Sequence, residues 1–141
     1  MKLLNELLES FCESIAAETI EIYNEFSLQH ELGLFLREKL PDYKVQFERN
    51  ISFFFPPHRA FTKREIDITV FSPHAPGRMN LKYAIELKYP RNGQYPEQMF
   101  SFCKDIAFLE ELQVAGFGSA ALLILAEDRP FYEGKTEGIY A

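Results

Sequence analysis

The chain has no tryptophan, only two cysteines and no long hydrophobic run. Cys12 and Cys103 lack the CxxC spacing of metal and redox motifs, and the three scattered histidines form no zinc signature. The longest apolar stretch, residues 120–126, is too short to cross a bilayer, and glutamates occupy the N-terminal positions where a signal peptide carries positive charge. We therefore expect two buried thiols, no structural zinc and no contact with a membrane, in a soluble protein of the cytoplasm.

The composition is that of a folded protein, with 47% hydrophobic and 15% aromatic residues among 141. This length predicts a single domain, residues 1–141, with a substantial core. The net charge of −6 argues by itself against a polyanionic partner. Basic residues nevertheless gather in residues 58–91, where seven of them accompany three acidic ones for a net charge of +4, which leaves −10 elsewhere. A polyanion such as nucleic acid can therefore approach this segment.

Apolar residues at helical spacing predict three helices. The first, over residues 2–25, carries glutamates on its polar face, and the second, over residues 28–39, begins after Ser27 as its N-cap. The third covers about residues 95–114. The domain thus divides into an N-terminal amphipathic helix, a core, and a tail that could be truncated, over residues 1–26, 27–126 and 127–141.

A period of two predicts three strands, joined by short turns into an antiparallel meander, over about residues 43–55, 64–72 and 81–89. Residues 120–126 form an unbroken apolar strand, which is typical of a strand buried on both faces. A helical crossover reaches this strand, so we expect it to lie parallel to the strand it joins. The element order indicates an α/β fold with a mixed central sheet of about four strands flanked by helices.

Three charged residues stand inside the second and third predicted strands, whose other members are mostly apolar. Asp67 points away from the face of Ile66 and Ile68, and Glu86 and Lys88 share one face because they are two residues apart. If the two strands are neighbours, two carboxylates and an ammonium group gather in one patch. A structural salt bridge on a solvated sheet face is the other interpretation, although aspartate is a poor strand former between β-branched neighbours.

Oxygen ligands of this kind suit Mg²⁺ or Mn²⁺, and phosphodiester hydrolysis needs such a cation to neutralise phosphate charge and to activate water. Asp67 and Glu86, with the Leu87 carbonyl, can supply the ligands. Lys88 can position the attacking water or stabilise the developing charge. Glu31 lies on the flank of the buried stripe of the second predicted helix, from which a carboxylate could reach the edge of the site.

Asp67 on the second strand and Glu86 and Lys88 on the third, within this order of elements, resemble the PD-(D/E)xK superfamily of nucleases. The resemblance covers roughly residues 27–126 and departs from the motif at Ile66, which stands where the named proline would be. It implies a restriction-endonuclease-like αβββαβ core. It also implies that Asp67, Glu86 and Lys88 are catalytic, with Mg²⁺ (or Mn²⁺) as the cofactor.

The same resemblance assigns two further residues. Glu31 matches the glutamate that many members carry on the helix before the sheet, and it would be a catalytic residue and an additional metal ligand. Gln98, at the start of the helix after the third strand, resembles a glutamine of some nuclease branches. Nucleic-acid phosphates could be held beside the site by basic residues of the connecting loops, namely Arg59, Lys63, Arg64, Arg78 and Arg91.

We therefore expect a metal-dependent nuclease that hydrolyses phosphodiester bonds, with DNA as its partner. A catalytically silent nuclease-like module that binds nucleic acid or a protein stays open as an alternative. The acidic N-terminal helix leaves a third interpretation open, an interaction or oligomerisation domain that docks a partner or a second copy through this helix.

Overall fold

The computed structural model describes the backbone of residues 3–57, 59–73, 79–90, 95–126 and 139–140, and the side chains of all of these except 95–98 and 139–140. Its helices are α1 (Leu4–Ala16), α2 (Glu25–Lys39), the short 3-10 helix η1 (Ile51–Phe53) and α3 (Tyr95–Ala115). Its strands are β1 (Lys44–Asn50), β2 (Glu65–Pro73), β3 (Met79–Lys88), β4 (Ser119–Ile124) and β5 (Ile139–Tyr140).

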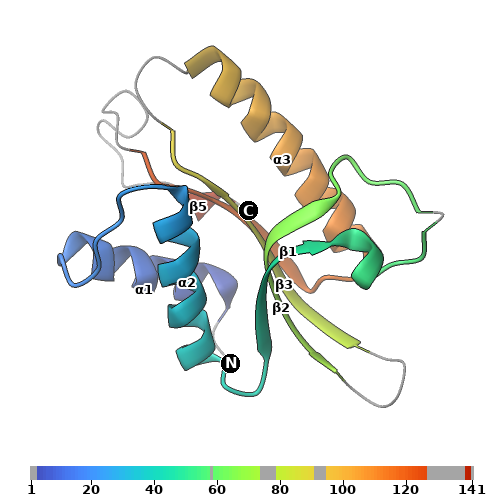
Figure 1. Cartoon of the computed structure of the whole chain (residues 1–141), viewed down its shortest axis with the longest axis horizontal. Coiled ribbons are helices and arrows are strands. Elements are labelled where there is room, and N and C mark those ends of the chain that lie inside the picture. Colours follow the sequence, from blue (N-terminus) through green and yellow to red (C-terminus); the bar gives the residue numbers. More distant parts are fainter. Residues whose placement is uncertain (1–2, 58, 74–78, 91–94, 127–138, 141) are drawn as a thin grey trace.

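One mixed sheet contains all of these strands, in the order β1-β2-β3-β4-β5 (Figure 1). β1 pairs with β2 and β2 with β3 in antiparallel fashion, which confirms the predicted meander. α3 leads to β4, which is parallel to β3, so the predicted crossover is confirmed as well. β5 pairs antiparallel with β4 and was not predicted. The mixed α/β class is thus confirmed, and residues 139–140 belong to the sheet.

Helices cover both faces of the sheet, with α1 and α2 on one side and α3 on the other (Figure 1). Alternation along β3 supplies both cores, since Tyr83, Ile85 and Leu87 pack with the leucines of α1 and α2 whereas Ala84 packs with α3. Glu86 follows the same alternation toward α3 and is fully buried. The sheet therefore carries a charged side chain into the mainly apolar layer beneath α3.

The boundary between α1 and α2 differs from the prediction. α1 ends at Ala16 because Glu18 takes a left-handed backbone with φ of 60°, so the expected helix over residues 2–25 is too long. α2 then starts one turn earlier than predicted. Its N-cap is Asn24, whose Oδ1 accepts a hydrogen bond from the Ser27 N–H at 2.7 Å, while the Ser27 hydroxyl accepts one from the Asn24 N–H at 3.0 Å. Ser27 is the third residue of the helix, where it closes this capping box, and is not the cap itself.

The first strand is also shorter than predicted. It ends at Asn50, and Ile51–Phe53 turn into η1, where the Ile51 N–H donates to the Arg64 carbonyl at 2.7 Å. The aromatic residues after it pack among themselves and against Phe71 and Phe117. The alternation of apolar residues beyond Asn50 therefore reflects an aromatic cluster and not a continuing strand.

The two cysteines differ in exposure. Cys12 is half-buried and Cys103 is exposed, so the prediction of two buried thiols is wrong for Cys103, which lies on the outer side of α3. Among the described residues, no helix has the length and apolar character needed to span a membrane.

Candidate functional site

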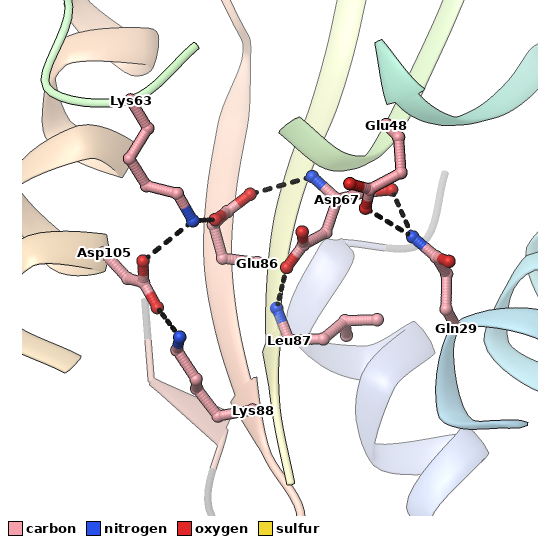
Figure 2. A network of polar contacts seen from close by, with 8 residues as sticks. All are labelled: Gln29, Glu48, Lys63, Asp67, Glu86, Leu87, Lys88 and Asp105. Atoms are coloured by element: carbon pink, nitrogen blue, oxygen red, sulfur yellow. Dashed lines mark hydrogen bonds and ion pairs between the residues drawn. The ribbon is translucent and has the colours of Figure 1, made fainter. Parts of the chain in front are cut away.

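The candidate site lies where β2 and β3 part. Their described pairing ends at Ile68 opposite Ile85, and the next residues in register are Asp67 and Glu86. Here side chains replace the backbone ladder: the Asp67 N–H donates to Glu86 Oε2 at 2.9 Å, and the Leu87 N–H donates to Asp67 Oδ2 at 2.8 Å. Each carboxylate thus satisfies an N–H group that the separation of the strands leaves without a ladder partner. The predicted neighbours are brought together (Figure 2).

Glu86 is the start of an ion-pair chain toward α3. The Lys63 ammonium contacts Glu86 Oε1 and donates to Asp105 Oδ1 at 3.0 Å. Lys88 Nζ stands 3.1 Å from Asp105 Oδ2, an ion pair without hydrogen-bond geometry. Asp105 is 2% exposed, so it is a buried anion held between two ammonium groups that reach solvent. Figure 2 shows this chain on the α3 side of the sheet.

A cavity of about 260 Å³ opens on the other side of Asp67, toward the start of α2. It is lined by Glu25, Phe26, Gln29, Glu48, Asp67 and Leu87. Gln29 Nε2 donates to Glu48 Oε2 at 3.0 Å and to the Asp67 carbonyl at 2.9 Å, which fixes α2 to both strands. Glu48 lies opposite Asp67 in the register of β1 and β2, and its left-handed φ of 53° departs from an extended strand.

Negative charge exceeds positive charge at this opening. The described side chains around it supply two ammonium groups, from Lys63 and Lys88, and five carboxylates, from Glu25, Glu48, Asp67, Glu86 and Asp105. Such an excess in a partly buried place attracts either protons or a cation.

The two central carboxyl groups show this excess in their pKa values. Burial, followed by the charge of Glu86, raises the pKa of Asp67 from 3.8 to about 8, against the Leu87 N–H bond and Lys63, which lower it. Burial also raises the pKa of Glu86, although Lys63 opposes the rise. Burial lowers the pKa of Lys63, but Glu86 and Asp105 more than offset this and hold it above its ordinary value. The lysine therefore stays charged while the carboxylate pair retains a proton near neutral pH.

These pKa values predict that the metal-free protein loses stability as pH rises. Between about pH 4 and 8 folded Asp67 holds a proton that the unfolded chain has released, so the free energy of unfolding falls across this window. We expect a loss on the order of 1–3 kcal/mol between pH 5 and 8 that Asp67→Asn removes. Urea denaturation in EDTA measures it, and equal pH slopes in the two proteins would contradict the prediction.

The donor chemistry of the opening fits Mg²⁺ or Mn²⁺. Both ions prefer oxygen ligands, and Mg²⁺ in proteins is commonly held by only one or two carboxylates, with water and substrate phosphates completing its shell. Asp67 and Glu86 meet that requirement. Within the part of the chain that the structure describes, no three His, Cys, Asp or Glu side chains stand close enough to hold a metal ion as they are placed. Lys63 occupies the Glu86 oxygen that a cation would otherwise share.

The other predicted site residues fall into three groups. In the described network Lys88 forms its ion pair with Asp105 and not with Asp67 or Glu86. Leu87 contacts Asp67 through its N–H, which donates to the carboxylate. Glu31 is half-buried and is not among the described residues that line the cavity, where α2 presents Glu25 and Gln29 instead. The third group consists of the predicted nucleic-acid contacts.

Of these contacts, Lys63 is already paired with Glu86 and Asp105 and so belongs to the ion-pair chain of the site. Arg59 and Arg64 are exposed beside it. Arg78, Arg91 and the side chain of Gln98 lie outside the described residues.

The sequence interpretation missed Asp105, Glu48, Gln29 and Glu25. A signal existed for Asp105, since it follows Phe102 by three residues and precedes Leu109 by four, which places it within the apolar stripe of α3. Glu48 and Gln29 carry no comparable signal, because polar residues that alternate with apolar ones on a strand, or that border the apolar stripe of a helix, are ordinary.

Comparison of the chain with protein-family models, with curated proteins and with solved structures yields no match. The resemblance to the PD-(D/E)xK superfamily therefore remains a prediction, carried by the element order and by Asp67, Glu86 and Lys88.

Proposed function

We propose that the chain is a metal-dependent nuclease that hydrolyses phosphodiester bonds of DNA with Mg²⁺ or Mn²⁺. The observation that carries this proposal is the pair formed by half-buried Asp67 and fully buried Glu86 in the gap between β2 and β3. Two adjacent carboxylates that are withdrawn from water destabilise a fold unless something positive joins them. A divalent cation that enters through the opening of the sheet would offset the repulsion between the two carboxylates, which favours a metal site at this pair.

The roles follow from position. Asp67 and Glu86 hold the cation, whose chemistry is to neutralise charge on the phosphate and to lower the pKa of the attacking water. Lys63 and Lys88 bring two positive charges to the same place, with side chains 27% and 20% exposed, so a phosphate can reach them. They orient water or stabilise the charge that develops on the phosphate. Asp105 fixes both ammonium groups from α3.

A second function is favoured by one specific contact. Lys63 already neutralises Glu86, so the carboxylate pair is partly satisfied without a metal ion. In a catalytically silent module this ion pair would be the permanent state of the site, and the surrounding basic residues would bind nucleic acid without cutting it. Such a module binds oligonucleotides with strong salt dependence and shows no turnover.

Turnover separates the two functions. Purified protein is incubated with single- and double-stranded DNA and RNA in Mg²⁺ or Mn²⁺, with and without EDTA. We expect metal-dependent cleavage of DNA that EDTA stops and that is lost in Asp67→Ala. Binding without cleavage in either metal would instead support the silent module.

Metal binding itself predicts a gain in thermal stability. A ligand that binds only the folded state stabilises it by about 2.7 kcal/mol at a concentration one hundred times its Kd. We expect Mn²⁺ or Mg²⁺ to raise Tm by several degrees, and EDTA to reverse the rise. Glu65→Gln, which removes an exposed carboxylate of the same strand, is the matched control and keeps the response. An equal rise in Asp67→Asn would place the metal elsewhere.

A further inference from the structure

A second hollow lies beside the candidate site, between α2 and β1. It has a volume of about 600 Å³, within the range of roughly 300–1,000 Å³ usual for ligand sites. Residues 45–50 of β1 line one side, and four residues of α2 line the other, namely His30, Gly33, Leu34 and Arg37. Their spacing of i, i+3, i+4 and i+7 puts them on one face of the helix. We call this hollow the β1 groove.

The β1 groove leads to the carboxylate pair. Glu48 lines both the groove and the smaller cavity that contains Asp67. β1 is the first strand of the sheet, so no further described strand pairs with its outer edge. A chain lying in the groove therefore reaches Glu48, whose side chain also borders the cavity of Asp67. Gln29 holds the Glu48 carboxylate at this junction.

The groove carries two guanidinium groups, one of which is held in place. Arg37 and Arg49 line it against a single carboxylate, that of Glu48, and His30 lines it as well. The Arg49 guanidinium donates through Nε to Gln46 Oε1 at 2.7 Å and lies 3.9 Å from the centre of the Phe53 ring. A guanidinium fixed in this way retains further N–H groups and loses little entropy when it binds a phosphate.

The floor of the groove offers an aromatic surface. Phe47 is 41% exposed, and its ring lies against the backbone of α2 at Gly33, where a Cβ would stand 2.2 Å from Phe47 Cζ. Glycine at this position therefore lets the ring lie between helix and strand. Exposed aromatic rings beside basic side chains are the surfaces on which unpaired bases stack.

We propose that the β1 groove binds a single strand of nucleic acid and leads it to the carboxylate pair, a substrate class that rests on the proposed nuclease function. A double helix fits less well, because its bases are already paired and stacked and cannot stack on the exposed Phe47 ring as unpaired bases can. An extended acidic peptide is the other occupant that the charges allow. It fits less well, since the left-handed backbone of Glu48 interrupts the regular edge on which a peptide strand would pair.

Fluorescence anisotropy in EDTA measures binding without cleavage. The probes are a labelled single-stranded 20-mer of DNA, the same sequence as RNA, and the corresponding DNA duplex. The groove variant is Arg37→Gln with Arg49→Gln, and the matched control is Lys39→Gln with Lys104→Gln, which removes two exposed charges outside the groove and outside the site. Arg37→Gln alone, at an exposed position, serves if the double variant folds poorly.

We expect a single strand, of either sugar, to bind at least about tenfold tighter than the duplex. The groove variant should lose about tenfold or more for the single strand and lower the salt slope by about 1.4, since each phosphate contact contributes about 0.7. Phe47→Leu should weaken binding with no change in that slope. The control should keep wild-type preference.

Three results would contradict single-strand binding in the β1 groove. They are equal affinity for duplex and single strand, an equal loss of affinity in the control variant, and displacement of the oligonucleotide by a polyglutamate peptide at similar concentration. The nuclease proposal fails separately. Tight single-strand binding without turnover in Mg²⁺ supports single-strand binding in the β1 groove and contradicts the nuclease proposal. Duplex cleavage that the groove variant leaves unchanged supports the nuclease proposal and contradicts the role of the β1 groove.

Discussion

Asp67→Asn is expected to abolish cleavage and to stabilise the metal-free protein at the same time. Asparagine keeps the oxygen that accepts the Leu87 N–H, so the local geometry is preserved. It removes the charge that repels Glu86, and it removes a ligand of the proposed metal ion. Loss of a residue that merely supports a ligand costs about 10–100-fold in metal affinity, so we expect a loss above 100-fold in metal affinity and in cleavage rate.

The opposite signs of the two effects make this variant informative. In EDTA at pH 8, its Tm should exceed that of the wild type by a few degrees, because the folded wild type must ionise a buried carboxyl group there. Denaturation and cleavage assays on the same preparation measure both effects. Glu65→Gln should change neither. A variant that is less stable than the wild type and also inactive would show that Asp67 has a structural role only.

Asp67 and Glu86 could be predicted as neighbours because the information is local. A charged residue inside a buried strand is visible in the sequence, and two strands joined by a short turn pair with each other. The alternation of β3 was also visible, and it correctly separated Glu86 from the face of Ile85 and Leu87. The direction of Glu86 was therefore predicted correctly. The expectation that Ile66 and Ile68 share one face is wrong, because Ile66 packs with α3 whereas Ile68 packs with α1 and α2.

The residue of α2 that faces the site could not be predicted from the sequence. Glu31 lies about 60° from Leu28 in one direction, and Gln29 lies about 100° from it in the other. The sequence shows that both border the buried stripe, but only the packing of α2 on β1 and β2 decides which border faces the opening of the sheet. The structure gives that place to Gln29, through its bond to the Asp67 carbonyl.

Lys63 and Asp105 depend on contacts between distant segments. Lys63 belongs to the loop before β2 and Asp105 to α3, 42 positions later, and their pairing arises because α3 covers the sheet face on which Glu86 lies. Loop lysines are ordinarily solvated, so nothing local marked this one. The charge at Asp105 was visible within an apolar stripe, but its partners were not.

Asp105→Asn is expected to reduce cleavage about 10–100-fold, although this residue contacts neither Asp67 nor Glu86 in the described network. It holds Lys63 and Lys88 in place, so it is a positioning residue. Asparagine keeps the volume and loses the charge. We expect a loss of about 1–3 kcal/mol in the free energy of unfolding, below the 3–5 kcal/mol of a fully buried pair because both ammonium groups reach solvent. Glu110→Gln, at an exposed position of the same helix, is the control.

The pH dependence separates positioning from mere stability. The Asp105 charge helps to raise the pKa of Glu86, so its removal should lower that pKa. It also frees Lys63 to pair with Glu86 alone, which acts in the same direction. The acid limb of the pH–activity profile, and that of the Mn²⁺-induced rise in Tm, should therefore move to lower pH in Asp105→Asn. A less stable variant whose two profiles keep their wild-type positions would reduce Asp105 to a structural ion pair, because only a charge coupled to the Asp67 and Glu86 pair can shift the pH at which that pair binds metal.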